Sequence, residues 1–376
     1  MSLSKPSNRS STPRLFLIAF LCGCALWSID TLAQQPGSKL WEFGAGGSGI
    51  PQPAIDEYGN LFFGSGSSGR FYALDSTGSE LWEYQTGGQV VAPASLGPDG
   101  TVYFSSTDQK LYAFTPTGRR KWTFAPGGYP SGAPAVGVDG TIYVGFGSTL
   151  YSLNPDSAVN WQFSVSSTLG AGGAAIGADG TIYFGSWDQH VYALSPAGTN
   201  KWNYSDNFPA NGPPALDTNG NVYVGFDSGS IQVLNPQGTR IWGYSTLRSL
   251  YSSAIIGADG TVYLGSEQLY ALTAAGAFKW KFGPSVTGVG TVAVAADGTI
   301  YAGSDKLYAL NPTGLQKWSF AGGQAGFGAP TIGADGTVYV GCEDGKLYAV
   351  KGLSALASSA WPNYRRNARH TARSSS

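Results

Sequence analysis

Tryptophan recurs along this chain at a nearly constant interval of 38 to 41 residues. A Gly-x-Asp-Gly-Thr turn keeps the same register, as in Gly97–Thr101 and Gly177–Thr181, and so does a Leu-Tyr-Ala-Leu run at Leu269–Leu272. A shared period of this length indicates a repeat architecture, in which one structural unit is copied and stacked. The eight periodic residues are Trp41, Trp82, Trp122, Trp161, Trp202, Trp242, Trp280 and Trp318.

Each repeat is predicted to contain four short strands. In the second repeat Asp99-Gly100 is a hairpin dipeptide, and Ile142-Tyr143-Val144 in the third is apolar on both faces, as expected for a sheet between two other sheets. Residues 40–350 contain no long amphipathic stretch free of Gly and Pro, which argues against helical repeats. The strands of the second repeat are expected at residues 92–96, 101–105, 111–114 and 121–124.

These patterns predict an all-β fold, an eight-bladed β-propeller of four-stranded antiparallel blades. The first marker, Leu40–Phe43, has the fourth-strand pattern, and the last, Leu347–Val350, has the third-strand pattern. We therefore expect the N-terminal strand to complete the last blade, which closes the ring and removes its free edges. A strand around Trp361 is the alternative closure. Each periodic indole is expected to pack between adjacent blades.

Three regions are expected along the chain: a signal peptide at residues 1–33, the propeller at 34–356 and a basic tail at 357–376. The first region has positive residues followed by an apolar run, Leu15–Trp27, and a small-residue cleavage pattern, Thr31–Ala33. The chain is thus expected to be exported to the periplasm or beyond. Two alternatives remain open: a membrane anchor that stays attached, or lipidation at Cys24, which would make the mature chain an outer-membrane lipoprotein.

Composition gives little support for catalysis or for nucleic-acid binding. The formal net charge is −1, which provides no electrostatic attraction for nucleic acid. The two histidines, His190 and His370, restrict any His-based triad or metal site, and the mature chain would keep Cys342 as its single cysteine. We therefore expect a monomeric binding scaffold without metal or cofactor, and not an enzyme.

The segment between third and fourth strands resembles the tryptophan-docking motif of the pyrroloquinoline-quinone-like (PQQ-like) repeat family. Ala73–Gly78 followed by Trp82 has its Ala-x-Asp/Asn-x-x-Gly pattern, and so has Ala309–Gly314 followed by Trp318; the resemblance covers about residues 39–352. The interval from Ala to Trp is nine residues, one shorter than in the family's dehydrogenases. The family implies quinone-dependent alcohol or sugar dehydrogenation, or non-catalytic scaffolding, as in the propeller lipoprotein of the outer-membrane β-barrel assembly machinery. The dehydrogenases usually need a vicinal cysteine pair, which the mature chain lacks, so the scaffold branch is favoured.

A partner is expected on the face formed by the connections that vary between repeats, and at the central channel. Variation in loops on a constant frame is typical of binding loops, and exposed aromatic and Arg side chains are typical anchors. The partner could be a protein, a peptide or a glycan. The candidate residues are Trp187, Asp188, His190, Tyr129, Phe208, Arg248 and Tyr251.

The C-terminal tail carries a Trp-Pro-x-aromatic-Arg sequence from Trp361 to Arg365, similar to a short signature that accompanies some of these propellers. We expect Trp361 and Tyr364 to pin the chain end onto the ring while the tail's arginines stay solvated. The alternative is a docking tail for an acidic partner or surface.

Overall fold

The computed structural model describes residues 34–246, 248, 250, 252–283, 288–323, 326–359, 361–363, 365–367 and 369–372. Residues 35–376 form one compact unit. The expected signal peptide with Cys24, and the side chains of Tyr251 and Tyr364, lie outside the described residues. Within the described part, no helix is long and apolar enough to cross a membrane.

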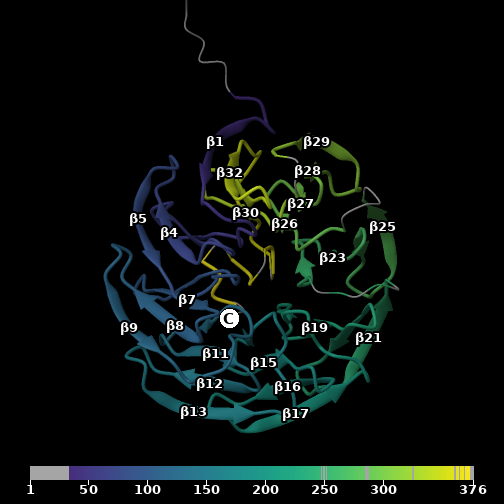
Figure 1. Ribbon diagram of the computed structural model, residues 1–376. Helices are drawn as coiled ribbons and strands as arrows, with labels where there is room; N and C mark the ends of the chain where they lie inside the picture. Colours follow the sequence, from purple (N-terminus) through teal and green to yellow (C-terminus); the bar gives the residue numbers. More distant parts are fainter. Residues whose placement is uncertain are drawn as a thin grey trace, which may run out of the picture. The chain divides into compact units, whose positions relative to one another are not determined.

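Eight four-stranded antiparallel sheets are arranged in a ring around a central channel (Figure 1). Blade 1 contains β2 (Ala54–Ile55), β3 (Leu61–Gly64), β4 (Arg70–Leu74) and β5 (Glu80–Gln85). Blade 2 contains β6 (Ser95–Leu96), β7 (Val102–Ser106), β8 (Lys110–Phe114) and β9 (Arg120–Phe124). Blade 3 contains β10 (Ala135–Val136), β11 (Ile142–Phe146), β12 (Thr149–Leu153) and β13 (Val159–Ser164). Blade 4 contains β14 (Ala175–Ile176), β15 (Ile182–Gly185), β16 (His190–Leu194) and β17 (Asn200–Ser205).

The other four blades repeat this order. Blade 5 contains β18 (Ala215–Leu216), β19 (Val222–Gly225), β20 (Ser230–Leu234) and β21 (Arg240–Ser245). Blade 6 contains β22 (Ile255–Ile256), β23 (Val262–Gly265), β24 (Leu269–Leu272) and β25 (Phe278–Phe282). Blade 7 contains β26 (Ala293–Val294), β27 (Ile300–Gly303), β28 (Leu307–Leu310) and β29 (Gln316–Phe320). Blade 8 contains β30 (Thr331–Ile332), β31 (Val338–Gly341), β32 (Lys346–Val350) and β1 (Lys39–Gly44).

The eight-bladed propeller and its closure by the N-terminal strand are confirmed. Strand β1 pairs antiparallel with β32, with Trp41 opposite Ala349. The Lys346 Nζ and Glu42 Oε1 atoms, from the two ends of the chain, lie 2.6 Å apart. Trp361 does not supply a fourth strand, because it forms an isolated bridge with Ile256 of β22 instead. The first strand of each blade is only two residues long, shorter than the five residues expected for the second repeat.

The hairpins between first and second strands are held by the Asp of the repeated turn. In blade 2 the Thr101 backbone N–H donates to Asp99 Oδ1 at 3.0 Å, and the Thr101 hydroxyl donates to Asp99 Oδ2 at 2.7 Å. Gly100 follows with φ of 79°, a left-handed conformation that glycine adopts without strain. The buried strands that follow, such as β7, then pack on both faces, whereas the outer strand β9 keeps alternate side chains exposed.

Seven of the periodic tryptophans contact the third-to-fourth turn of the next blade, and Trp318 contacts the segment that precedes β1. The Trp82 ring lies against Gly118, where an added Cβ would come within 2.7 Å of the indole. Trp318 packs in the same way on Gly37, but its Nε1 has no hydrogen-bond partner among the described residues. All eight rings are half-buried. The other indole N–H groups donate to the next blade's carbonyl, from Trp41 to Ser76, Trp82 to Pro116, Trp122 to Pro155, Trp161 to Pro196, Trp202 to Pro236, Trp242 to Ala274 and Trp280 to Pro312.

The C-terminal segment runs into the middle of the ring (Figure 1, yellow). Trp361 is buried, with 1% of its surface exposed. The expectation that the tail's arginines stay solvated is wrong for Arg365, which is 2% exposed. Its guanidinium reaches backbone carbonyls inside the ring, which compensate for the loss of water around the charge.

Candidate functional site

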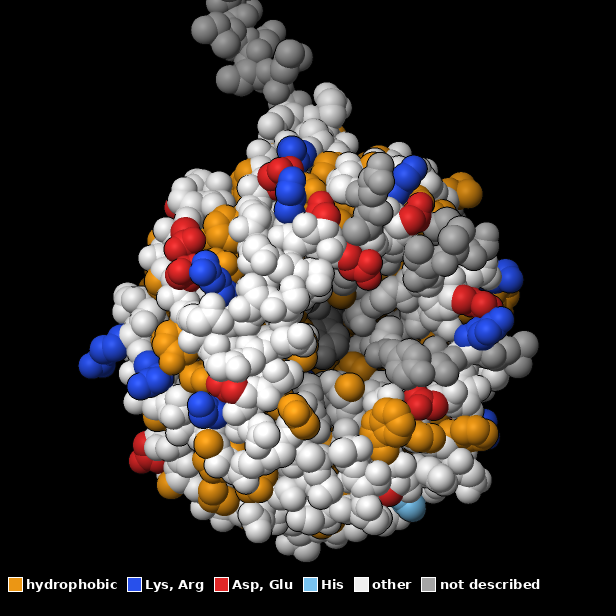
Figure 2. All heavy atoms as spheres, in the orientation of Figure 1, with side chains coloured by type: hydrophobic (Ala, Val, Ile, Leu, Met, Phe, Trp, Pro, Cys, Tyr) orange, Lys and Arg blue, Asp and Glu red, His pale blue; other side chains and the backbone are white. Residues whose placement is uncertain are grey.

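The propeller has two different ends. One end carries the first-to-second and third-to-fourth turns, and we call it the turn face. The other carries the second-to-third and fourth-to-first connections, and we call it the variable-loop face, because these connections differ between repeats. Figure 2 looks onto the variable-loop face and shows a hollow near its centre.

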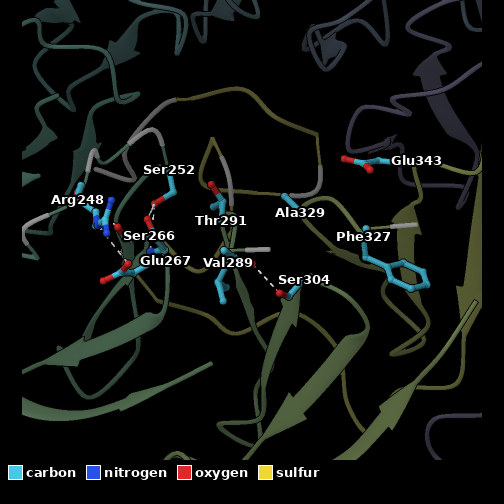
Figure 3. Close-up of a pocket in the computed structure, with 15 residues that line it drawn as sticks. Arg248, Ser252, Ser266, Glu267, Val289, Thr291, Ser304, Phe327, Ala329 and Glu343 are labelled. Carbon is cyan, nitrogen blue, oxygen red and sulfur yellow. Dashed lines mark hydrogen bonds and ion pairs between the residues drawn. The ribbon is translucent and has the colours of Figure 1, made fainter. Parts of the chain in front are cut away.

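A cavity of about 730 Å³ opens on the variable-loop face between blades 6, 7 and 8. Arg248 and Glu267 line one side, and Phe327 and Glu343 lie across from them (Figure 3). The Arg248 Nε and Glu267 Oε2 atoms lie 3.3 Å apart, and 71% and 51% of these side chains are exposed. Such an exposed ion pair contributes little to stability. Both charged groups therefore remain accessible at the rim of the cavity.

Hydrogen bonds from small hydroxyl side chains fix the loops of this cavity. The Ser252 hydroxyl donates to the carbonyl of Gly265 at 2.7 Å, and the Ser304 hydroxyl donates to that of Gly288 at 2.6 Å. The first bond joins a fourth-to-first connection to the end of β23, and the second joins a fourth-to-first connection to the residue that follows β27. At Gly303 an added Cβ would collide with the carbonyl oxygen of Gly328. The connections therefore rest closely on the ends of the second strands, which preforms the cavity.

Three of the predicted residues are exposed aromatic side chains on the variable-loop face. Tyr129 follows β9, Trp187 lies between β15 and β16, and Phe208 follows β17; their exposed fractions are 66%, 48% and 49%. The loops of Trp187 and Phe208 are in contact, because the Ala210 N–H donates to the carbonyl of Ser186 at 3.1 Å. These aromatics belong to loops of blades 2 to 5, whereas the cavity belongs to blades 6 to 8.

Asp188 is a structural residue of its loop. Its side chain is only 7% exposed, and it accepts hydrogen bonds from the Tyr192 hydroxyl at 2.8 Å and the Ser166 hydroxyl at 3.2 Å. Burial opposes ionisation, but these bonds outweigh it and hold the pKa of Asp188 below its ordinary value. The His190 ring Nδ1 lies 2.9 Å from the Asp188 carbonyl oxygen. The structure therefore gives Asp188 a role in shaping the loop that presents Trp187.

The same arrangement recurs in two other blades, which sequence reasoning missed. The Tyr112 hydroxyl donates to Asp108 Oδ2 at 2.6 Å, and the Tyr348 hydroxyl donates to Asp344 Oδ2 at 2.6 Å. An Asp followed four residues later by Tyr is the sequence signal common to the three loops. The Asp side chain thus stabilises the second-to-third connection in each of these three blades.

Within the described residues, Arg248 is the one member of the predicted set that lines the cavity. Sequence reasoning missed Glu267, Phe327 and Glu343, which the cavity brings together from blades 6 to 8. Their common signal is weak: each lies where a second-to-third or fourth-to-first connection departs from the other repeats.

The described residues also bear on whether this chain holds a metal ion. No group of three or more His, Cys, Asp and Glu side chains in the described part lies close enough together to hold a metal ion. Cys342 is buried, and burial raises the pKa of its thiol to about 11, which disfavours the reactive thiolate. That the chain is not an enzyme stays a prediction.

Comparison with known proteins supports this description of the fold. A family model described as outer membrane protein assembly factor BamB matches residues 28–172, 116–258 and 265–376. The crystal structure of BamB from Moraxella catarrhalis is similar, with a TM-score of 0.69 and 17% identity over 84% of this chain and 99% of that chain. No curated protein matches the sequence. Because the family model spans most of the sequence, the chain belongs to the PQQ-like β-propeller family of outer membrane protein assembly factor BamB.

Proposed function

We propose that this chain is a non-enzymatic scaffold of the bacterial cell envelope that binds a protein partner through its variable-loop face. The proposal rests on one observation: the turns of the turn face are alike between repeats, whereas the connections of the variable-loop face differ from repeat to repeat. The variable-loop face gathers three exposed aromatic side chains and the cavity, which are features of partner-binding surfaces. The family description supports an envelope role and a protein partner in preference to a peptide or glycan.

Two surface regions would share the work of binding. Trp187 and Phe208 expose apolar surface to water, and exposed aromatic side chains contribute strongly to the free energy of binding at interfaces. Arg248, Glu267 and Glu343 offer charges of both signs at the rim of the cavity. Charges at an interface rim steer encounter and select partners more than they add affinity.

The test compares capture of envelope proteins by three forms of the purified chain after crosslinking. The double variant Trp187→Ala with Arg248→Ala removes one anchor from each region. Tyr58→Ala is the matched control, because Tyr58 is an aromatic residue that is 79% exposed on the turn face. We expect the double variant to lose partner capture by more than about tenfold, which is the scale of a hot-spot substitution. Equal capture by all three forms would remove the proposal.

Export by residues 1–33 and lipidation at Cys24 are separate parts of the proposal. Mass spectrometry of the chain purified from its native membrane and soluble fractions distinguishes them. A mature chain that begins at Gln34 supports export without an anchor, and an acylated N-terminal Cys24 supports the outer-membrane lipoprotein.

For the dehydrogenase alternative, purified chain mixed with the quinone and calcium is expected to show neither tight binding nor dye-linked alcohol oxidation.

A further inference from the structure

The described residues of the C-terminal segment, 353–359, 361–363, 365–367 and 369–372, pair with the innermost strands of the ring. In blades 6 and 7 the N–H groups of Ile256 and Val294 donate to the carbonyls of Trp361 and Pro362 at 2.8 and 2.9 Å. These donors occupy the same position, the second residue of the first strand. Their N–H groups point into the channel, where water or another chain must satisfy them.

The segment then crosses the channel to the opposite blades. The N–H groups of Leu96, Val136 and Ile176, at the same strand position in blades 2, 3 and 4, donate to carbonyls of Arg369, Thr371 and Ala372 at 3.0, 3.2 and 2.7 Å. One segment of about twenty residues therefore hydrogen-bonds the inner edge of five blades. The contacts on both sides of the ring place it across the channel.

Side chains of the segment fill the space between these contacts. The Arg365 Nη1 and Nη2 atoms donate to the carbonyls of Gly172 at 3.1 Å and Pro134 at 2.6 Å. The Gln52 amide donates to Asn363 Oδ1 at 2.7 Å. Asn363 and His370 have no exposed surface. The segment thus places polar side chains in the buried centre of the ring. Hydrogen bonds compensate for the water that these groups lose.

The ring is shaped to accept this arginine. Gly173 has φ of 71°, and an added Cβ there would lie 2.8 Å from Arg365 Nη1. A hydrogen bond from a buried cation to a carbonyl is stronger than one between neutral groups. Arg365 therefore ties the far half of the segment to blades 3 and 4, in addition to the backbone bonds of Thr371 and Ala372.

We infer that residues 353–372 are a built-in plug, which makes the channel a cup that opens on the variable-loop face alone, and that Arg365 positions the plug. The cavity of blades 6 to 8 is lined by none of the described plug residues, so the plug leaves it open. A partner segment can then enter from the variable-loop face but cannot thread through the ring. This inference does not rest on the proposed function.

Native-state hydrogen exchange of the full chain tests the plug. In Arg365→Ala we expect the amides of Leu96, Val136 and Ile176 to exchange about 10- to 100-fold faster, the factor expected for loss of a charged hydrogen bond. The amides of Ile256 and Val294, which pair with Trp361 and Pro362, are expected to keep their protection. Arg119→Ala is the matched control, because it removes an exposed arginine from a turn on the turn face.

Limited proteolysis of the native chain and of Arg365→Ala is a second, independent measurement. Trypsin is expected to leave the native chain uncut after Arg365, Arg366 and Arg369, and to cut after Arg366 and Arg369 in Arg365→Ala. Rapid exchange of the Leu96, Val136 and Ile176 amides in the unaltered chain would overturn the inference. Cleavage of the native chain at Arg365 at the rate of an unfolded peptide would do the same.

Discussion

Replacement of Trp202 by Ala tests the packing that joins the blades. The Trp202 N–H donates to the carbonyl of Pro236 in the next blade at 2.8 Å, and its ring lies 5.8 Å from that of Tyr183. Gly238 lies flat against the indole, because an added Cβ there would come within 2.6 Å of it. The contacts with Pro236 and Gly238 tie blade 4 to blade 5, whereas the contact with Tyr183 lies within blade 4.

The magnitude follows from the area and the hydrogen bond. A half-buried indole covers about 150 Å², which at about 25 cal/mol per Å² is worth about 4 kcal/mol as an upper bound. The hydrogen bond adds about 1 kcal/mol. Because the unfolded chain already buries part of this area, we expect Trp202→Ala to lower the free energy of unfolding by about 3–5 kcal/mol.

Chemical denaturation followed by circular dichroism measures this loss. Trp187→Ala is the matched control, because Trp187 is 48% exposed on a loop and docks no blade. Trp187→Ala is expected to lower the free energy of unfolding by no more than about 0.5 kcal/mol, as for other surface substitutions. A loss below about 1 kcal/mol for Trp202→Ala, or equal losses for the two variants, would refute the docking role.

Three further predictions concern single contacts. Trp202→Phe is expected to cost about 1 kcal/mol more than Trp318→Phe, because the Trp318 N–H has no hydrogen-bond partner among the described residues to lose; denaturation of both variants checks this. Gly303→Ala is expected to cost about 1–3 kcal/mol by collision with Gly328, whereas Gly290→Ala, with nothing within 4 Å, should be near neutral; similar melting temperatures would contradict the close packing of the loops. Burial lowers the pKa of His370 from 6.5 to about 3, aided by the nearby Arg365 charge, so the unfolded state binds a proton that the folded state does not. Stability is therefore complete above pH 6.5 and falls as the pH drops toward 3, by about 1.4 kcal/mol between pH 7.5 and 5.5, and His370→Gln should abolish this fall.

The sequence predicts the frame well because each blade is defined by local signals. The Asp-Gly turn sets each first hairpin, and the periodic Trp marks each outer strand, so eight copies determine the number of blades. Closure through Leu40–Phe43 follows from counting strands, since the last repeat lacks its fourth strand. These features need no knowledge of contacts between distant residues.

The plug and the cavity depend on contacts that the sequence does not display. The tail has no strand periodicity, and an arginine pair such as Arg365-Arg366 usually stays in water. Burial of Arg365 becomes favourable only because carbonyls of Pro134 and Gly172 converge on it inside the closed ring. The place of Asp188 in a variable loop predicts a binding residue, whereas its hydrogen bond from Tyr192 holds its side chain within that loop.

Photo-crosslinking in the native envelope tests most directly whether the variable-loop face is the partner surface. A photoreactive residue would replace exposed positions one at a time, Tyr129 and Phe208 on the variable-loop face and Tyr58 and Val138 on the turn face. We predict crosslinked partner adducts from the first two positions and none from the last two. Adducts from Tyr58 and Val138, with none from Tyr129 and Phe208, would contradict the account.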